Sequence, residues 1–80
     1  MNITVLFFAS LAEKAQQGQQ QLSVEGKLSL PELYAKLTQD HGFTLEPAKV
    51  RVAINDEFAS WDDVINDGDT IAFIPPVAGG

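Results

Sequence analysis

The segment from Ser29 to Gly42 predicts one amphipathic helix, and this constrains the fold more than any other feature of the sequence. Its start, SLPE, has the capping-box pattern, in which the Ser29 hydroxyl and the Glu32 carboxylate satisfy free backbone donors, and proline suits the first turn. Gly42 is expected to end the helix as a left-handed residue. A single stripe of apolar side chains follows the spacing i, i+3, i+4 and i+7: Leu30, Leu33, Tyr34 and Leu37. Such a helix needs an apolar surface to cover.

The rest of the chain supplies that surface as predicted strands. Alternating, β-branched and aromatic residues predict strands at 3–8, 21–25, 50–54, 57–60 and 70–74. A short helix is expected at 11–16 with Ser10 as its cap, one helical turn at 61–66, and tight turns at 55–56 and 66–69. One main helix across a mixed sheet predicts an α+β fold in a single domain, because 80 residues support one core.

Composition excludes several classes of function. Eleven acidic against five basic residues give a net charge of -6, which repels nucleic acid and anionic membranes. The chain has no cysteine and one histidine, so disulfides, zinc-thiolate sites and cysteine nucleophiles are excluded and no metal site is expected. The longest apolar run near the start, Val5 to Ala9, is too short to span a bilayer, and a cytoplasmic protein is expected.

Most polar candidates have a structural explanation. His41 lies at the predicted C-terminus of the helix, where its side chain suits the helix dipole. Asp62 and Asp63 follow Trp61 at a position that favours capping of a helical turn over acid–base catalysis. Six acids and no base lie between Asp56 and Asp69, which indicates either solvated turns or a face that attracts a basic partner.

Three apolar side chains are candidates for contact with a partner protein. Phe8 and Ile74 point away from the predicted core face of their strands, and Phe58 lies in an otherwise polar hairpin arm. Cover by the short helix or simple surface exposure are the alternatives. We expect a partner to bury Phe8, Phe58 and Ile74.

The last six residues, PPVAGG, predict a delivery arm beyond a domain of residues 1–74. Pro75 and Pro76 favour an extended start, and the remaining four residues reach at most about 13 Å. Gly79 and Gly80 lack Cβ atoms and fit a narrow channel, so the arm presents the α-carboxylate of Gly80. A carboxylate reacts only after activation, for example adenylation by ATP in a partner, and sulfide or an amine then attacks. An inert, frayed terminus is the alternative.

Four stretches, VLFFASLAE, VAINDEF, NDGDTIAFIPP and PPVAGG, resemble the molybdopterin synthase small-subunit family across the whole chain. The resemblance implies a ubiquitin-like β-grasp. It implies that Gly80 is adenylated by a ubiquitin-activating-like adenylyltransferase and converted to a thiocarboxylate. That group would donate sulfur to cyclic pyranopterin monophosphate and so form the molybdopterin dithiolene, a step of molybdenum cofactor biosynthesis. ATP would be consumed by the activating partner, and no cofactor is expected on this chain.

The resemblance also assigns roles to individual residues. The chain would be the non-catalytic sulfur carrier in a heterotetramer with the large subunit, which holds the catalytic residues. Phe8, Phe58 and Ile74 would contact the partners, while the family more often has Phe at position 74 and Arg in place of Ala12. The inserted tail would comprise Pro75, Pro76, Val77, Ala78 and Gly79.

Three other functions share this fold and tail. One is a sulfur carrier for thiamin or cysteine biosynthesis, which differs in the protein that accepts the sulfur. Another is a protein modifier, whose activated glycine is attacked by a lysine. The last is a ubiquitin-like interaction domain with an inert tail.

Overall fold

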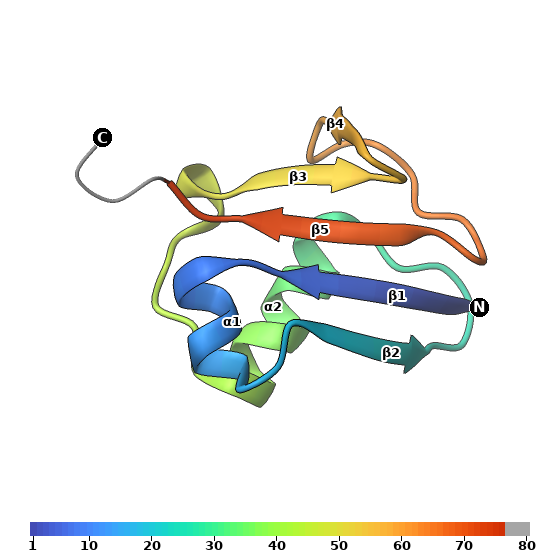
Figure 1. The fold of residues 1–80 in the computed structure, drawn as a ribbon. Coiled ribbons are helices and arrows are strands. Elements are labelled where there is room, and N and C mark those ends of the chain that lie inside the picture. The colour runs from blue at the N-terminus through green and yellow to red at the C-terminus, as the bar shows by residue number, and fades with distance from the viewer. Residues whose placement is uncertain (77–80) are drawn as a thin grey trace.

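Five strands form one mixed sheet in the computed structural model, which describes residues 1–76 (Figure 1). The strands run across the sheet in the order β2-β1-β5-β3-β4, and two α-helices and a short 3-10 helix complete the fold. The elements in chain order are β1 (Asn2–Phe7), α1 (Ala9–Ala15), β2 (Gln19–Ser23), α2 (Leu30–His41), η1 (Pro47–Lys49), β3 (Arg51–Ile54), β4 (Glu57–Ala59) and β5 (Thr70–Ile74). The predicted α+β class and the order of the strands and α-helices are confirmed.

The first and last strands pair at the centre of the sheet. β1 and β5 are parallel, with Phe7 opposite Phe73, whereas the other neighbouring strands are antiparallel. Parallel strands end at the same edge of a sheet, so the end of β1 and the end of β5 lie together (Figure 1).

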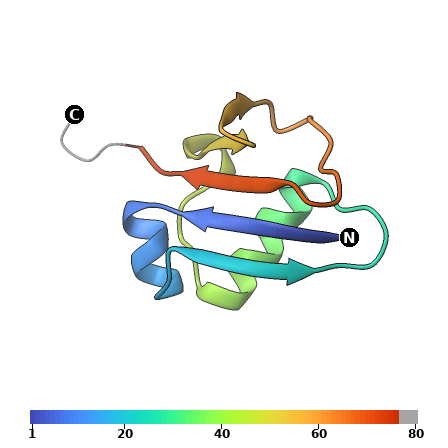
Figure 2. The same cartoon turned by 45° about the vertical axis from the view of Figure 1, so that its right-hand side comes forward.

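The core lies between this sheet and α2, which crosses one face of it (Figure 2). Every second residue of β1 points into the core, as the alternation predicts. Tyr34 is buried with the apolar stripe of α2, and its hydroxyl donates to the carbonyl of Leu45 at 2.9 Å. Burial raises the pKa of this phenol. The core side chains that are less than 2% exposed include Ile3, Val5, Leu30, Leu33, Leu37, Ile71 and Phe73.

The predicted capping box at the start of α2 is confirmed. The Ser29 hydroxyl accepts from the Glu32 amide at 3.2 Å, and the Glu32 carboxylate accepts from the Ser29 amide at 3.0 Å. The hydrogen bonds from the Ser29 amide and hydroxyl lower the pKa of Glu32. The charged form of Glu32 therefore adds stability above its ordinary pKa, and this part is lost as the pH falls through the lowered value. Gly42 ends the helix with φ of 75°.

The predicted bounds of the first helix and of the second strand are wrong. α1 starts at Ala9 with Phe8 as its N-cap residue and no side-chain cap, so Ser10 does not cap it. β2 starts at Gln19 and ends at Ser23, two residues earlier than predicted. The glutamine run looks like a loop by composition, but pairing with β1 holds it extended, with Gln19 opposite Leu6.

The predicted helical turn at 61–66 is also wrong in extent. The amide of Asp63 donates to the carbonyl of Ser60 at 3.0 Å, which closes a single turn. The chain then becomes extended, and Val64 forms an isolated bridge with Ser29. No helix within residues 1–76 is long and apolar enough to cross a membrane.

Replacing Ser29 with alanine removes the hydroxyl acceptor of the capping box. We expect a loss of about 1 kcal/mol in the free energy of unfolding, because the Glu32 amide loses its partner at the helix N-terminus. Urea unfolding at neutral pH measures this loss. The control is Ser23→Ala in β2, an exposed serine outside any cap. Equal stability of Ser29→Ala and Ser23→Ala would show that the cap contributes nothing.

Candidate functional site

The face of the sheet turned away from α2, here called the outer face, is the candidate site. Strand alternation and register place one set of side chains on it, opposite to the core set. Most are small or apolar, which suits contact with another protein surface. The central members of the outer face are Thr4, Leu6, Arg51, Ala53, Phe58, Thr70, Ala72 and Ile74.

The three predicted partner-binding residues lie at this face or its margin. Phe8 directly follows β1 and is 45% exposed, while Phe58 on β4 is 65% exposed. Ile74 is half-buried at the end of β5. Because Phe7 is opposite Phe73, Phe8, which follows β1, and Ile74, which ends β5, lie at the same edge of the sheet.

A small hollow brings two of these residues together. Its volume is about 210 Å³, and it is lined by Ala53, Asp56, Phe58 and Ile74. Ala53 is opposite Phe58 on one side and Ala72 on the other. The short side chains of the two alanines leave space open between Phe58 and Ile74. Phe8 does not line this hollow. The geometry fits an apolar side chain of a partner between Phe58 and Ile74.

Arg51 also lies on the outer face, although the sequence did not identify it as a site residue. It lies opposite Ile74 on the neighbouring strand, and its Cζ atom is 4.1 Å from the centroid of the Phe58 ring. This is the geometry of a cation–π contact. The alternation in VRVAI could have placed Arg51 opposite to the core residues Val50 and Val52, but not over Phe58.

The described part of the predicted delivery arm begins at β5. Pro75 is buried and Pro76 is exposed, so the chain reaches solvent at Pro76, at the same edge as Phe8. The remaining predicted tail residues, Val77, Ala78, Gly79 and Gly80, lie outside the described residues. The predicted division into residues 1–74 and 75–80 stays a prediction.

A polar contact fixes the hairpin that carries Phe58. Asn55 and Asp56 form its turn with φ of 51° and 72°, the positive values that a tight two-residue hairpin turn requires. The Asn55 amide side chain donates to the Asp69 carboxylate at 2.9 Å and accepts from the Thr70 amide at 3.0 Å. Asp69, only 9% exposed, also accepts from the Asn66 amide at 2.8 Å. The hairpin turn is thus bound to the turn that precedes β5.

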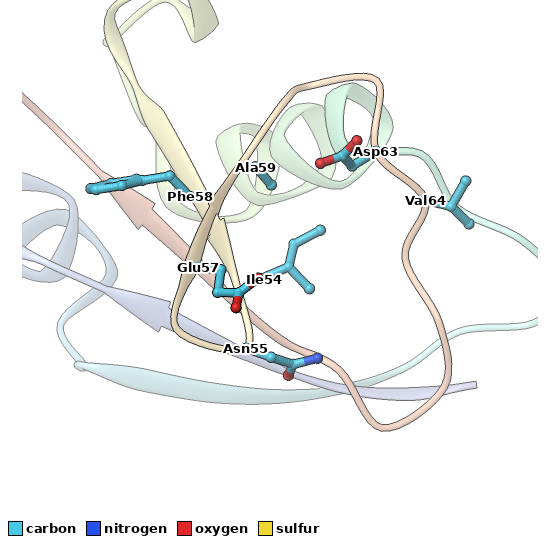
Figure 3. A pocket seen from close by; sticks show the side chains of 7 residues that line it. All are labelled: Ile54, Asn55, Glu57, Phe58, Ala59, Asp63 and Val64. Carbon is cyan, nitrogen blue, oxygen red and sulfur yellow. The ribbon is translucent and has the colours of Figure 1, made fainter.

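A larger open hollow lies on the other side of β4. Its volume is about 500 Å³, and Figure 3 shows the Phe58 side chain pointing away from Ile54 and Val64. It contains neither Phe8 nor Ile74 nor any proline of the tail. Its lining residues are Ile54, Asn55, Glu57, Phe58, Ala59, Asp63 and Val64.

The other polar candidates have structural contacts. His41 shares a 2.8 Å hydrogen bond with Gln20 and packs edge-on against Phe7. The Asp63 carboxylate accepts from the Ser60 amide at 3.0 Å, so the predicted capping role is confirmed for Asp63. Within residues 1–76, no three His, Asp or Glu side chains form a group that could hold a metal ion.

Comparison with known proteins places this chain among small ubiquitin-like proteins. Residues 5–80 match the model of the ThiS family. The molybdopterin synthase sulfur carrier subunit of Escherichia coli is 32% identical over 80 residues, covering 98% of this chain and 99% of the relative.

Two solved structures share the fold over the full length of both chains. Small archaeal modifier protein 1 of Haloferax volcanii has a TM-score of 0.80 at 26% identity. A chain from the complex of subunits 1 and 2 of the molybdopterin-converting factor of Helicobacter pylori has a TM-score of 0.68 at 27% identity. These matches confirm the β-grasp and the family resemblance expected from the sequence.

The contact between Asn55 and Asp69 is expected to stabilise the hairpin that carries Phe58. Asp69→Ala should lower the free energy of unfolding by about 1–3 kcal/mol, because it leaves the Asn66 amide and the Asn55 side chain without their acceptor. Thermal unfolding measures this change, and Asp62→Ala, which removes an exposed carboxylate, is the matched control. Equal melting temperatures for the two variants would rule out a stabilising role of the contact.

Proposed function

Since this chain belongs to the ThiS family, we propose that it is the sulfur carrier subunit of a molybdopterin synthase. The observation that carries the proposal is the extent of the match. The family model continues to Gly80, and the Escherichia coli sulfur carrier subunit aligns over 98% of this chain. The glycine pair at the end is therefore included in the family match.

In this proposal the reacting group is the carboxylate of Gly80. The carboxylate attacks the α-phosphate of ATP in an adenylyltransferase partner, and pyrophosphate leaves. A sulfide equivalent then attacks the acyl adenylate, AMP leaves, and a thiocarboxylate remains. The exit of the chain at exposed Pro76 supports delivery of this group away from the folded domain.

The large subunit would catalyse the transfer of sulfur to cyclic pyranopterin monophosphate. Pro75, Pro76, Val77, Ala78 and Gly79 would lead the thiocarboxylate into its active site. The outer face supports this arrangement, because exposed Phe58 lies on the sheet from which the tail departs and exposed Phe8 lies directly after β1. This chain would supply position and sulfur but no catalytic side chain, and a heterotetramer would be the working assembly.

A protein modifier is the second candidate. Similarity to the small archaeal modifier protein, with a TM-score of 0.80, supports this alternative. Both functions require an activated Gly80, and they differ in the group that attacks it. Sulfide gives a thiocarboxylate, whereas a lysine amine gives an isopeptide bond to another protein.

Intact mass spectrometry tests the terminal chemistry. The chain is produced together with the adenylyltransferase from the same organism and a sulfur source, and is then treated with iodoacetamide. We expect a mass gain equal to the replacement of one oxygen by sulfur, and alkylation that maps to Gly80. Because the chain has no cysteine, alkylation at Gly80 is diagnostic of a thiocarboxylate.

The control is the chain that lacks Gly80, which should remain unmodified. An unmodified terminus in the full chain would contradict the sulfur carrier proposal. Conjugates to lysines of other proteins would favour the modifier. If sulfur is present but not transferred to cyclic pyranopterin monophosphate by the large subunit, the acceptor belongs to another pathway.

Truncation of the exposed aromatic residues tests the docking face. Phe8→Ala and Phe58→Ala should each weaken binding to the large subunit by more than about 1 kcal/mol, as expected for aromatic side chains that an interface buries. Isothermal titration calorimetry measures the affinity. Val64→Ala is the matched control, because Val64 is 72% exposed but does not lie on the outer face. If all three variants bind alike, the outer face is not the interface.

A further inference from the structure

Arg51 is the one charged residue that the strands of residues 1–76 place on the outer face. The register aligns the outward-facing positions of all five strands, and the others are uncharged. Besides Arg51, these positions hold Asn2, Thr4, Leu6, Gln19, Gln21, Ser23, Ala53, Phe58, Thr70, Ala72 and Ile74. Arg51 is exposed and lies opposite Ile74. The turn residue Asp56 lines the hollow beside Phe58 and Ile74 but forms no ion pair with Arg51 within residues 1–76.

The guanidinium of Arg51 is held in place but has no anionic partner within residues 1–76. Its Cζ atom lies 4.1 Å from the centroid of the Phe58 ring. The ion pair found in the described part of the chain joins Lys36 to Asp40 on α2. A guanidinium that contacts an aromatic ring still has N–H donors for an anion, and its position costs less entropy to fix upon binding.

We propose that Arg51 is a specificity-determining residue that binds a carboxylate of the molybdopterin synthase large subunit. This inference rests on the proposed function and adds the chemistry of the partner surface. An apolar patch of the large subunit would cover Phe8, Phe58 and Ile74, and one Asp or Glu side chain of the large subunit would face Arg51. Two N–H donors of Arg51 fit the two oxygens of a carboxylate.

The charge distribution of the chain favours a single carboxylate in this position. The net charge of -6 repels acidic partner surfaces, so a partner carboxylate is favoured only where a local cation outweighs that repulsion. Among the strand residues of the outer face within residues 1–76, Arg51 is the one that provides such a local cation. An ion pair surrounded by Ile74 and Phe58 is shielded from water, and the contact therefore orients the partner as well as attracting it.

The test is the affinity of Arg51→Met for the large subunit from the same organism. Methionine keeps a flexible apolar chain over Phe58 and removes the charge. We expect binding to weaken by at least about thirtyfold, as for loss of one member of a charge pair that an interface shields from water. Lys36→Met is the matched control, with the same change in net charge on the helix side of the sheet, and it should bind like the wild type. Thermal unfolding verifies that both variants are folded.

Two further measurements separate the ion pair from simple packing. Raising the salt concentration from about 0.1 M to about 1 M shortens the screening length from about 10 Å to about 3 Å, and should reduce the difference in affinity between the wild type and Arg51→Met. Arg51→Lys should bind between the two, because lysine keeps the charge without the planar fork. In a double-mutant cycle, Phe58→Ala and Arg51→Met should be non-additive, since Phe58 holds the guanidinium.

Three outcomes overturn the proposal. If Arg51→Met binds as tightly as the wild type, no carboxylate faces Arg51. If its effect disappears in chains that end at Pro76 as a carboxamide, the carboxylate is the chain's own Gly80 and not the partner's. If the wild-type chain does not bind the large subunit at all, the proposed function fails together with this inference, and the mass spectrum of Gly80 then identifies the function that replaces it.

Discussion

The parallel pairing of β1 with β5 joins two parts of the sheet that have no other connection through strands. β2 pairs with β1 on one side, and β3 and β4 follow β5 on the other. An isolated pair of strands is marginally stable in water, so the two-stranded part formed by β2 and β1 is not expected to persist without β5. The same pairing brings Phe8 to the edge where Ile74 and Pro75 leave the sheet. The chain exit and the apolar residues beside it therefore have one structural origin.

The sequence predicts the fold where local signals and burial agree. The capping box, the apolar stripe of α2 and the alternation in β1 and β5 each combine a local preference with a buried face, and all were predicted correctly. The predicted position of β2 is two residues too late, because glutamines give no strand signal and pairing with β1 decides their conformation. The helical turn predicted at 61–66 extends too far, because its end is set by a bridge between Val64 and Ser29, which are distant in sequence.

The candidate site follows the same division. Phe8, Phe58 and Ile74 could be predicted, because an apolar residue outside the core alternation is visible in the sequence. The sequence does not predict that Arg51 belongs to the site, because this depends on its diagonal contact with Phe58 across β3 and β4. The bond between Asn55 and Asp69 was equally hidden, because it joins two turns separated by 14 positions. Both features arise from cross-strand geometry, which a pattern along one strand does not contain.

An open sheet has two edge strands, and here they differ. β4 has three residues, whereas β2 has five and carries no charge and no proline along Gln19–Ser23. Unpaired backbone groups on such an edge form a template on which a second copy could add a strand. Mutual repulsion between chains of net charge -6 opposes that addition. The acidic surface thus acts as a colloidal stabiliser, and this protection vanishes near the isoelectric point of about 4.3, where the glutamine edges of two molecules meet without an electrostatic barrier.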